Sequence, residues 1–164
     1  MCPNPSAFRR HELLSSSLFL DAATPQDRVW AADLALRSGV CAAVVVDGSG
    51  FSMCATRRLQ LATEAGGALA MGGVCLLARP PREEKELSAA TTRWVVRRAV
   101  GPAEVRRWSV ELLRCKGMQP SALHAVSRPW VVEHDHATGD LRMAADLRDG
   151  LGKTQAGQAV ARTA

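Results

Sequence analysis

Two short apolar runs constrain the fold more than any other feature of this sequence. They are VCAAVVVDG at residues 40–48 and GVCLLARP at residues 73–80. The first run is too short and too rich in valine to favour a helix. A continuous apolar run of this length is typical of a parallel strand that is covered on both faces. We therefore expect two buried parallel strands.

The residues before the first run predict a helix. Thr24 is a suitable N-cap, Pro25 suits the first helical position, and Arg37 and Gly39 are typical of the last turn and the residue beyond it. The preceding segment SLFLD, at residues 17–21, predicts a short strand.

A second helix is expected between the two apolar runs. Ser52 can cap the segment MCATRRLQLATEA, which we expect to end at Gly66-Gly67. The resulting order of strand, helix, strand, helix and strand is typical of a parallel α/β sheet with right-handed crossovers.

The pattern changes after residue 80. The charged segment at residues 80–90 is expected to be an exposed loop or a short helical piece. Residues 92–98 and 106–114 are expected to be strands. In the second, Trp108, Val110 and Leu112 alternate with Ser109, Glu111 and Leu113, as in a half-buried antiparallel strand. RPWVVEHD, ATGD and LRMAADL then predict a hairpin with Gly139 in its turn.

The expected fold class is therefore α/β, with a partial parallel sheet, flanking helices and a C-terminal antiparallel extension. We expect one domain over residues 13–147, a loose segment at 1–12 and a flexible tail at 148–164. The chain has 164 residues, enough for one buried core.

Composition restricts the class of protein. The formal net charge of +5 suits an acidic partner or a nucleic acid, although coding bias would give the same arginine-rich composition. Five cysteines lack a CxxC spacing, which favours a reducing compartment. Neither a signal peptide nor a membrane-spanning run is visible, so we expect a soluble, cytoplasmic protein.

Few residues suggest chemistry. Asp47 ends the first apolar run, where a carboxylate could hold Mg²⁺ or could form a turn with the following Gly-Ser-Gly. Arg114 and Lys116 could meet a phosphate or an acidic partner, or could protect a sheet edge. His134-Asp135-His136 could bind a metal ion, but a solvated hairpin tip is the favoured interpretation, because no further Cys or His lies near in the sequence.

Two other features have simple structural explanations. Gly152-Lys153-Thr154 looks like the end of a phosphate loop, but the position that needs the first glycine holds Leu147. We expect a terminal tail there. The tryptophans can stack on nucleotide bases, but packing in the core or at element edges is the expected use. They are Trp30, Trp94, Trp108 and Trp130.

Several segments together resemble the ImuA family, which are RecA-like accessory proteins of bacterial mutasomes and are related to SulA. The segments are RVWAADLALRSGVCAAVVVDG, ATRRLQLATEAGGA, RWSVELLRCKGMQPS and WVVEHDHATGDLRMAADL. The resemblance extends over about residues 13–147 and implies a RecA-like fold. It also implies an N-terminal truncation, because the phosphate loop and the catalytic Glu of that fold have no counterpart in the matched region.

The resemblance gives four residues candidate roles. Asp47 would be a vestige of the Walker B-like, Mg²⁺-binding position. Arg79 stands where RecA has a Gln that senses the γ-phosphate. Arg114 and Lys116 stand where RecA has two lysines that face a neighbouring subunit's nucleotide. The arginine at position 79 puts the usual sensing of ATP in doubt.

The function implied is that of a non-catalytic accessory protein in SOS-induced DNA repair and error-prone translesion synthesis, with no cofactor. Its partners would be an ImuB-type polymerase-like subunit, an error-prone replicative-type polymerase and RecA itself, with any DNA binding weak or indirect. Two alternatives are a RecA-type ATPase half completed by another chain, which would use ATP and Mg²⁺, and a SulA-like inhibitor of cell division.

Overall fold

The computed structural model describes residues 15–69, 73–101, 105–119, 121–123, 128–135 and 140–144. The predicted loose segment at 1–12, the hairpin turn at Gly139 and the tail at 148–164 lie outside these residues. The main elements in chain order are α2 (Pro25–Arg37), β1 (Ala43–Asp47), α3 (Met53–Leu69), β2 (Val74–Ala78), η2 (Pro81–Glu83), β3 (Thr92–Ala99), β4 (Arg106–Cys115), β5 (Trp130–His134) and β6 (Leu141–Met143).

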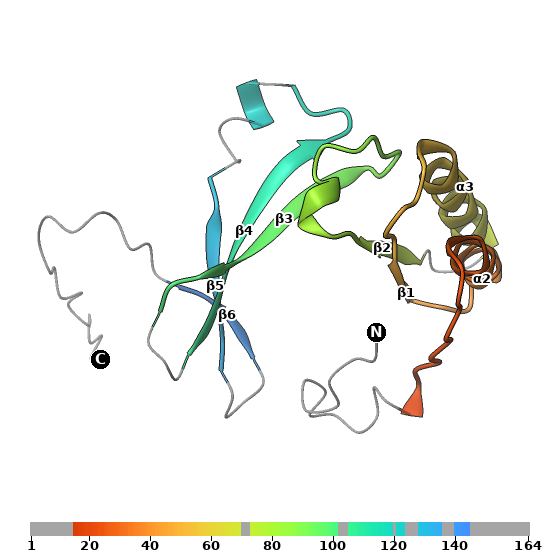
Figure 1. Ribbon diagram of the computed structural model, residues 1–164, viewed down its shortest axis with the longest axis horizontal. Helices are drawn as coiled ribbons and strands as arrows, with labels where there is room; N and C mark the ends of the chain where they lie inside the picture. Colours follow the sequence, from red (N-terminus) through yellow and green to blue (C-terminus); the bar gives the residue numbers. More distant parts are fainter. Residues whose placement is uncertain are drawn as a thin grey trace, which may run out of the picture.

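The described strands form two sheets, and the prediction of an α/β protein is confirmed at this level. Strands β1 and β2 are parallel, with Val45 opposite Leu76. Strands β3, β4, β5 and β6 form an antiparallel sheet in that order, as the alternating pattern predicts. Figure 1 shows α2 and α3 beside the β1–β2 pair and the antiparallel sheet at the other end of the molecule.

The strand predicted at residues 17–21 is wrong. These residues join neither sheet in the described structure. A strand needs a neighbour to satisfy its backbone N–H and C=O groups, and this segment pairs with neither β1 nor β2. Leu18, Phe19 and Leu20 are consequently exposed.

Helix α2 begins and ends as its sequence predicts. The Thr24 hydroxyl accepts a hydrogen bond from the Asp27 backbone N–H at 3.1 Å, which satisfies one of the free donors of the first turn. After the helix, Gly39 has a φ of 67°, in the left-handed region that glycine adopts without a steric cost.

Helix α3 begins as predicted but extends further. Ser52 caps it, since its hydroxyl accepts a hydrogen bond from the Ala55 N–H at 3.2 Å. Gly66 lies inside the helix, not at its end, because α3 continues to Leu69. A Cβ atom at Gly66 would lie 1.9 Å from the Leu36 carbonyl oxygen of α2. The glycine therefore permits a close approach of the two helices.

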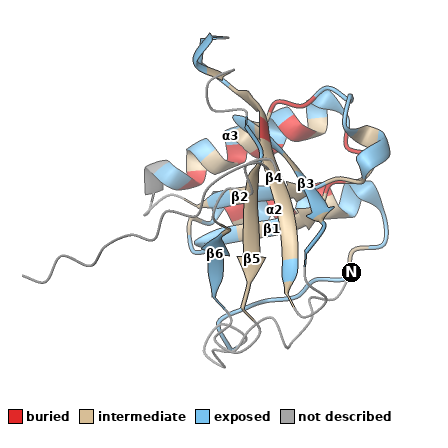
Figure 2. Cartoon of the chain, turned by 90° about the vertical axis from the view of Figure 1, so that its left-hand side faces the viewer, coloured by how far each residue is buried: buried red, intermediate tan, exposed pale blue. Residues whose placement is uncertain are grey.

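The hydrophobic core lies between the helices and one face of β1–β2. Its buried residues are Val29, Ala32, Leu36, Phe51, Leu59 and Ala62, and the strand residues Val44, Val46, Cys75 and Leu77 pack against them. Figure 2 shows buried residues along α3 and only exposed or intermediate ones on β5 and β6. The core is thus formed by the α/β half.

The expectation that both strands are covered on two faces is wrong. Helices α2 and α3 both pack on the same side, which leaves the other side exposed. We call this side the open face; its members are Ala43, Val45, Val74, Leu76 and Ala78. Val45 is 71% exposed and Leu76 is 53% exposed. An apolar strand with one bare face has surface available to another chain.

The charged segment between β2 and β3 is only partly exposed. It contains the short η2 helix, and a short helical piece is one of the two forms predicted for this segment. Its end is buried, however, at Ser88 and Ala89. The Thr56 hydroxyl of α3 accepts a hydrogen bond from the Ala89 N–H at 3.0 Å, which ties this segment to the helix.

Candidate functional site

The carboxyl ends of β1 and β2 are the first place to look for a ligand, because open α/β sheets bind ligands there. Asp47 is the last residue of β1, and its Oδ1 atom accepts two hydrogen bonds from Ser49. The backbone N–H donates at 3.0 Å and the hydroxyl at 2.5 Å. These bonds close a turn over Gly48, as the turn-forming interpretation of Asp47 requires.

A cation already accompanies Asp47. Arg28 of α2 places Nη1 3.5 Å from the Asp47 Oδ2 atom, and its Nη2 donates to the Ser49 carbonyl at 3.1 Å. The Arg28 guanidinium also lies 5.9 Å from the centre of the Phe51 ring. Arg28 therefore supplies the positive charge beside the Asp47 carboxylate that a bound Mg²⁺ ion would otherwise supply.

The pKa of Asp47 reflects these contacts. The Ser49 hydroxyl is the largest cause of a lowered pKa, followed by the Ser49 N–H, with Arg28 a smaller contributor. Asp47 is held ionised by its own turn. It does not have the raised pKa of a general acid or base that works near neutral pH.

Arg79 follows β2 and belongs to a second ion pair beside the same turn. Its guanidinium contacts Glu83 of η2 at 3.0 Å and donates to the Phe51 carbonyl at 3.2 Å. The Arg79 and Glu83 side chains are only 13% and 14% exposed. The Glu83 carboxylate also accepts from the Gly50 N–H at 3.1 Å.

The Arg79–Glu83 pair is electrically balanced. Burial would raise the pKa of Glu83, but the Gly50 N–H and the Arg79 guanidinium outweigh it and hold the pKa below its usual range. The strand-end site thus contains Arg28 and Arg79 against Asp47 and Glu83, all bound to one another or to the turn. Arg28 and Glu83 are not indicated by the sequence. The partners of Arg28 are 19 or more residues away, and the contact of Glu83 with Gly50 joins residues 33 apart, although Arg79 is only four residues before Glu83.

Arg114 and Lys116 have different surroundings. The Arg114 Nη2 donates to the Ser88 carbonyl at 2.7 Å and to the Ala90 carbonyl at 2.8 Å. The Lys116 Nζ instead contacts the Gln60 side chain of α3 at 3.1 Å, at an exposed position. The structure therefore does not bring the two cations together on one ligand. Arg114 holds the segment before β3, and Lys116 remains at the surface.

The possible metal triplet is only partly within the described residues. The His134 ring lies edge-on to Trp108, with centroids 6.2 Å apart, and Asp135 contacts Arg142 at 3.5 Å. His136 lies outside the described residues, as does the GKT segment. Within the described part, no group of three His, Cys, Asp or Glu side chains is placed to hold a metal ion.

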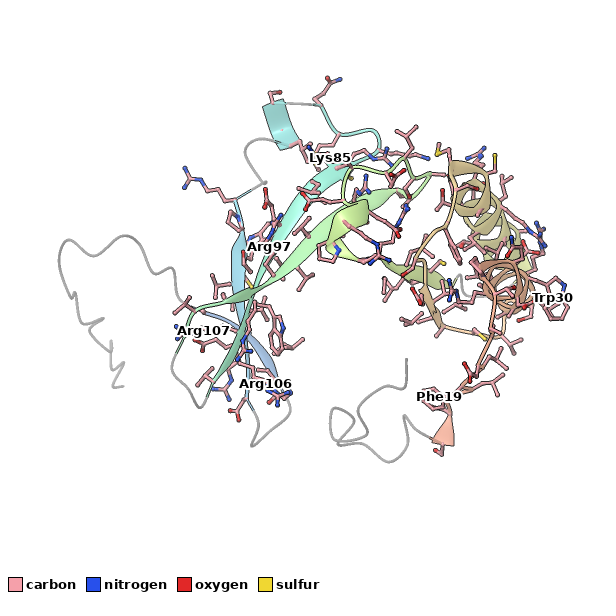
Figure 3. All side chains as sticks on the ribbon, viewed as in Figure 1. Phe19, Trp30, Lys85, Arg97, Arg106 and Arg107 are labelled. Carbon is pink, nitrogen blue, oxygen red and sulfur yellow. The ribbon has the colours of Figure 1, made fainter. Side chains whose placement is uncertain are left out.

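The tryptophans are more exposed than expected. Trp30 is 61% exposed on α2 and Trp94 is 46% exposed on β3, so neither lies in the core, although Trp94 makes a packing contact on the sheet. Figure 3 shows Trp30 at the outer side of the molecule. Trp94 packs against Trp130, with ring centres 5.7 Å apart and the rings tilted by 44°, and Trp108 is half-buried on β4.

Two surface depressions are also lined partly by arginines. One, of about 570 Å³, lies at α2 and α3 and is lined by Arg37, Met53, Cys54, Arg57, Arg58 and Leu61. The other, of about 270 Å³, is lined by Arg98, Arg106, Arg107 and Trp108. Neither depression is indicated by the sequence, because each brings together residues from more than one element or from the two faces of a strand. Both combine arginines with apolar or aromatic side chains.

Comparisons with known proteins give no independent identification. No protein-family model matches the chain, and searches of curated proteins and of solved structures give no significant match. None of the described helices is long and apolar enough to cross a membrane. The four cysteines in the described residues, Cys41, Cys54, Cys75 and Cys115, are free thiols, and burial raises the pKa of Cys75.

Proposed function

We propose that this protein is a non-catalytic, RecA-like interaction protein that acts in SOS-induced DNA repair and error-prone translesion synthesis. The partners are an ImuB-type polymerase-like subunit, an error-prone replicative-type polymerase and RecA. The proposal rests on the resemblance of residues 13–147 to the ImuA family, which also supplies the RecA-like assignment of the parallel half.

The main structural support is the open face of β1–β2. Five neighbouring residues of small or apolar character are exposed there, in a sheet whose other face is packed. An exposed apolar surface of this kind is typical of a binding surface. Both β1 and β2 are also edge strands of the described sheet, so each offers backbone groups to a partner.

The candidate nucleotide residues support a non-catalytic role in a second way. Asp47 and Arg79 are engaged by Arg28 and Glu83, and Arg114 is engaged by two backbone carbonyls. A nucleotide bound at the carboxyl ends of β1 and β2 would have to displace the ion pairs of Asp47 and Arg79.

Direct binding tests the proposal. The purified chain, shown to melt cooperatively, is passed over an immobilised ImuB-type subunit, and retention is measured against an unrelated immobilised protein. We expect specific retention. A cooperatively folded chain that binds neither the ImuB-type subunit, nor the polymerase, nor RecA would refute the proposed function.

The open sheet edges also favour one alternative, a RecA-type ATPase half completed by another chain that supplies a phosphate loop. In that case ATP and Mg²⁺ would stabilise the completed assembly, by about 2.7 kcal/mol at a hundred times the Kd. The absence of a thermal shift with ATP and Mg²⁺, both alone and with the completing segment, would exclude this alternative.

A further inference from the structure

The antiparallel sheet has one face that combines aromatic rings with arginines. In an antiparallel pair, directly opposite residues lie on the same face, and alternate residues of a strand share it. Trp108 lies opposite Arg98 of β3 and Val132 of β5. Arg106 is two residues before Trp108 and lies opposite His134. Arg98, Arg106, Trp108 and His134 therefore share one face, which we call the tryptophan face.

The two arginines of this face have no counter-charge among the described residues. Within the described residues, the side chains of Arg98 and Arg106 form no ion pair or hydrogen bond, and both are exposed. Arg97 lies on the opposite face of β3 and instead forms ion pairs with Glu84 at 3.1 Å and with Glu111 at 3.5 Å. Arg107, at the rim of the depression, is paired with Glu133. Among the described strand residues, the arginines whose side chains make neither an ion pair nor a hydrogen bond are thus the two beside Trp108.

A second aromatic group continues the same face. Trp94, Val96 and Arg98 alternate along β3, so Trp94 also lies on the tryptophan face. It is 46% exposed and its ring contacts that of Trp130 at a tilt of 44°. Arg98 is four positions after Trp94 along β3, which corresponds to about 13 Å along the strand. Trp94 and Trp108 therefore offer two aromatic surfaces spaced along the direction of the strands, and Arg98 and Arg106 lie beside Trp108.

We propose that the tryptophan face binds single-stranded nucleic acid. A base would stack on Trp108, whose ring His134 supports edge-on, and Arg98 and Arg106 would hold the adjacent phosphates. Aromatic platforms beside backbone-tracking cations are the usual means of binding single strands without sequence preference. A single strand is favoured over a duplex because its bases have free faces for stacking. The net charge of +5 adds long-range attraction. Figure 3 shows Arg106 and Arg107 at the end of the sheet that lies away from α2 and α3, so this surface is separate from the strand-end site.

The test uses the full chain and a fluorescent oligothymidylate of about 12 nucleotides, a length within the usual range for one binding module. Fluorescence anisotropy gives the Kd at several salt concentrations between about 50 and 200 mM. We expect binding that weakens steeply with salt. In the double variant R98A/R106A, the slope of log K against log salt falls in magnitude by about 1.4, which is two contacts of about 0.7 each.

The matched control is the double variant R57A/R82A, which removes the same charge from exposed positions on α3 and η2. We expect it to keep the wild-type slope. Equal effects of the two double variants would overturn the proposal, as would a folded wild-type chain that does not bind the oligothymidylate.

Trp108→Leu tests stacking separately, with an expected loss of affinity of about tenfold or more. If this variant folds poorly, the two arginine variants still decide, because both change exposed residues. A duplex of the same length that binds as tightly as the single strand would overturn the assignment to single strands. Binding to the ImuB-type subunit is not involved, so this proposal and the proposed function can fail independently.

Discussion

Asp33 is the only charged residue that is buried in the described part of the chain, and two arginines bind it. Its Oδ2 atom accepts from Arg37 of the same helix at 3.2 Å and from Arg58 of α3 at 3.1 Å. The bond from Arg58 is the largest cause of its lowered pKa, although burial opposes it. A single carboxylate thus connects α2 with α3.

This contact predicts a pH dependence of stability. A carboxyl group whose pKa is lowered by folding stabilises the folded state above its unfolded pKa, near 3.8, and loses that contribution as the pH falls through its folded pKa. We expect Asp33→Asn to cost about 1–2 kcal/mol at pH 7, because the charge-assisted bonds to two half-exposed arginines are weakened. Urea denaturation at pH 7 and at about pH 3 measures the difference. A cost that does not shrink at the lower pH would contradict this account.

Gly66 and Gly67 are neighbours in α3 with opposite expected behaviour. A side chain at position 66 would collide with the Leu36 carbonyl, so we expect Gly66→Ala to destabilise the protein by about 1–3 kcal/mol or more. Gly67 is exposed, and Gly67→Ala is expected to be neutral or to stabilise by up to about 1 kcal/mol, because alanine favours helix. Thermal melts of both variants check this, and similar effects at the two positions would show that the helices do not meet at Gly66.

At the scale of elements, β4 is held to the segment before β3 by Arg114. Arg114→Met leaves the Ser88 and Ala90 carbonyls without their donor, and we expect a loss of about 2 kcal/mol in unfolding free energy. Lys116→Met removes the same charge from an exposed contact with Gln60, and its expected cost is under about 0.5 kcal/mol. Denaturant titration compares them. Equal costs would mean that Arg114 is a surface cation like Lys116.

Strands β1 and β2 are expected to tolerate change on one face only. Val45→Thr and Leu76→Thr alter the open face, so each should change stability by less than about 0.5 kcal/mol. Leu77→Thr alters the face that packs on the core, and a loss of about 2 kcal/mol or more is expected. Chemical denaturation of the isolated chain measures all three. A large loss at Val45 or Leu76 would show that the open face is covered in the isolated protein.

The sequence predicts the elements better than it predicts their contacts. Capping residues are local signals, so Thr24 and Ser52 correctly mark the starts of α2 and α3. Gly66 was misjudged because the reason for a glycine there is the Leu36 carbonyl, which is distant in sequence. The apolar runs identify β1 and β2, but composition does not reveal that both helices pack on the same side. At the strand-end site, Asp47 is indicated by its position at the end of an apolar run, whereas the contacts of Arg28 with Asp47 and of Glu83 with Gly50 join residues far apart in the sequence.

At the scale of the whole molecule, the described structure has a packed α/β half and an antiparallel half in which the Trp94 and Trp108 rings share one face with Arg98 and Arg106. The open face of β1–β2 is the surface at which we propose that a protein partner binds. The tryptophan face is a separate surface with the chemistry of nucleic-acid binding. The two surfaces would allow one chain to contact a partner protein and a single strand at the same time.

The most direct test of the central claim is the affinity of an ImuB-type subunit for the double variant V45K/L76K, measured by calorimetry with folding checked by cooperative melting. Its control is V40K/V100K, which adds the same charge at two exposed valines outside the strands. The account predicts that the wild-type chain and the control bind and that V45K/L76K does not. Equal binding by all three proteins would contradict docking at the open face, and binding by none would contradict the proposed function.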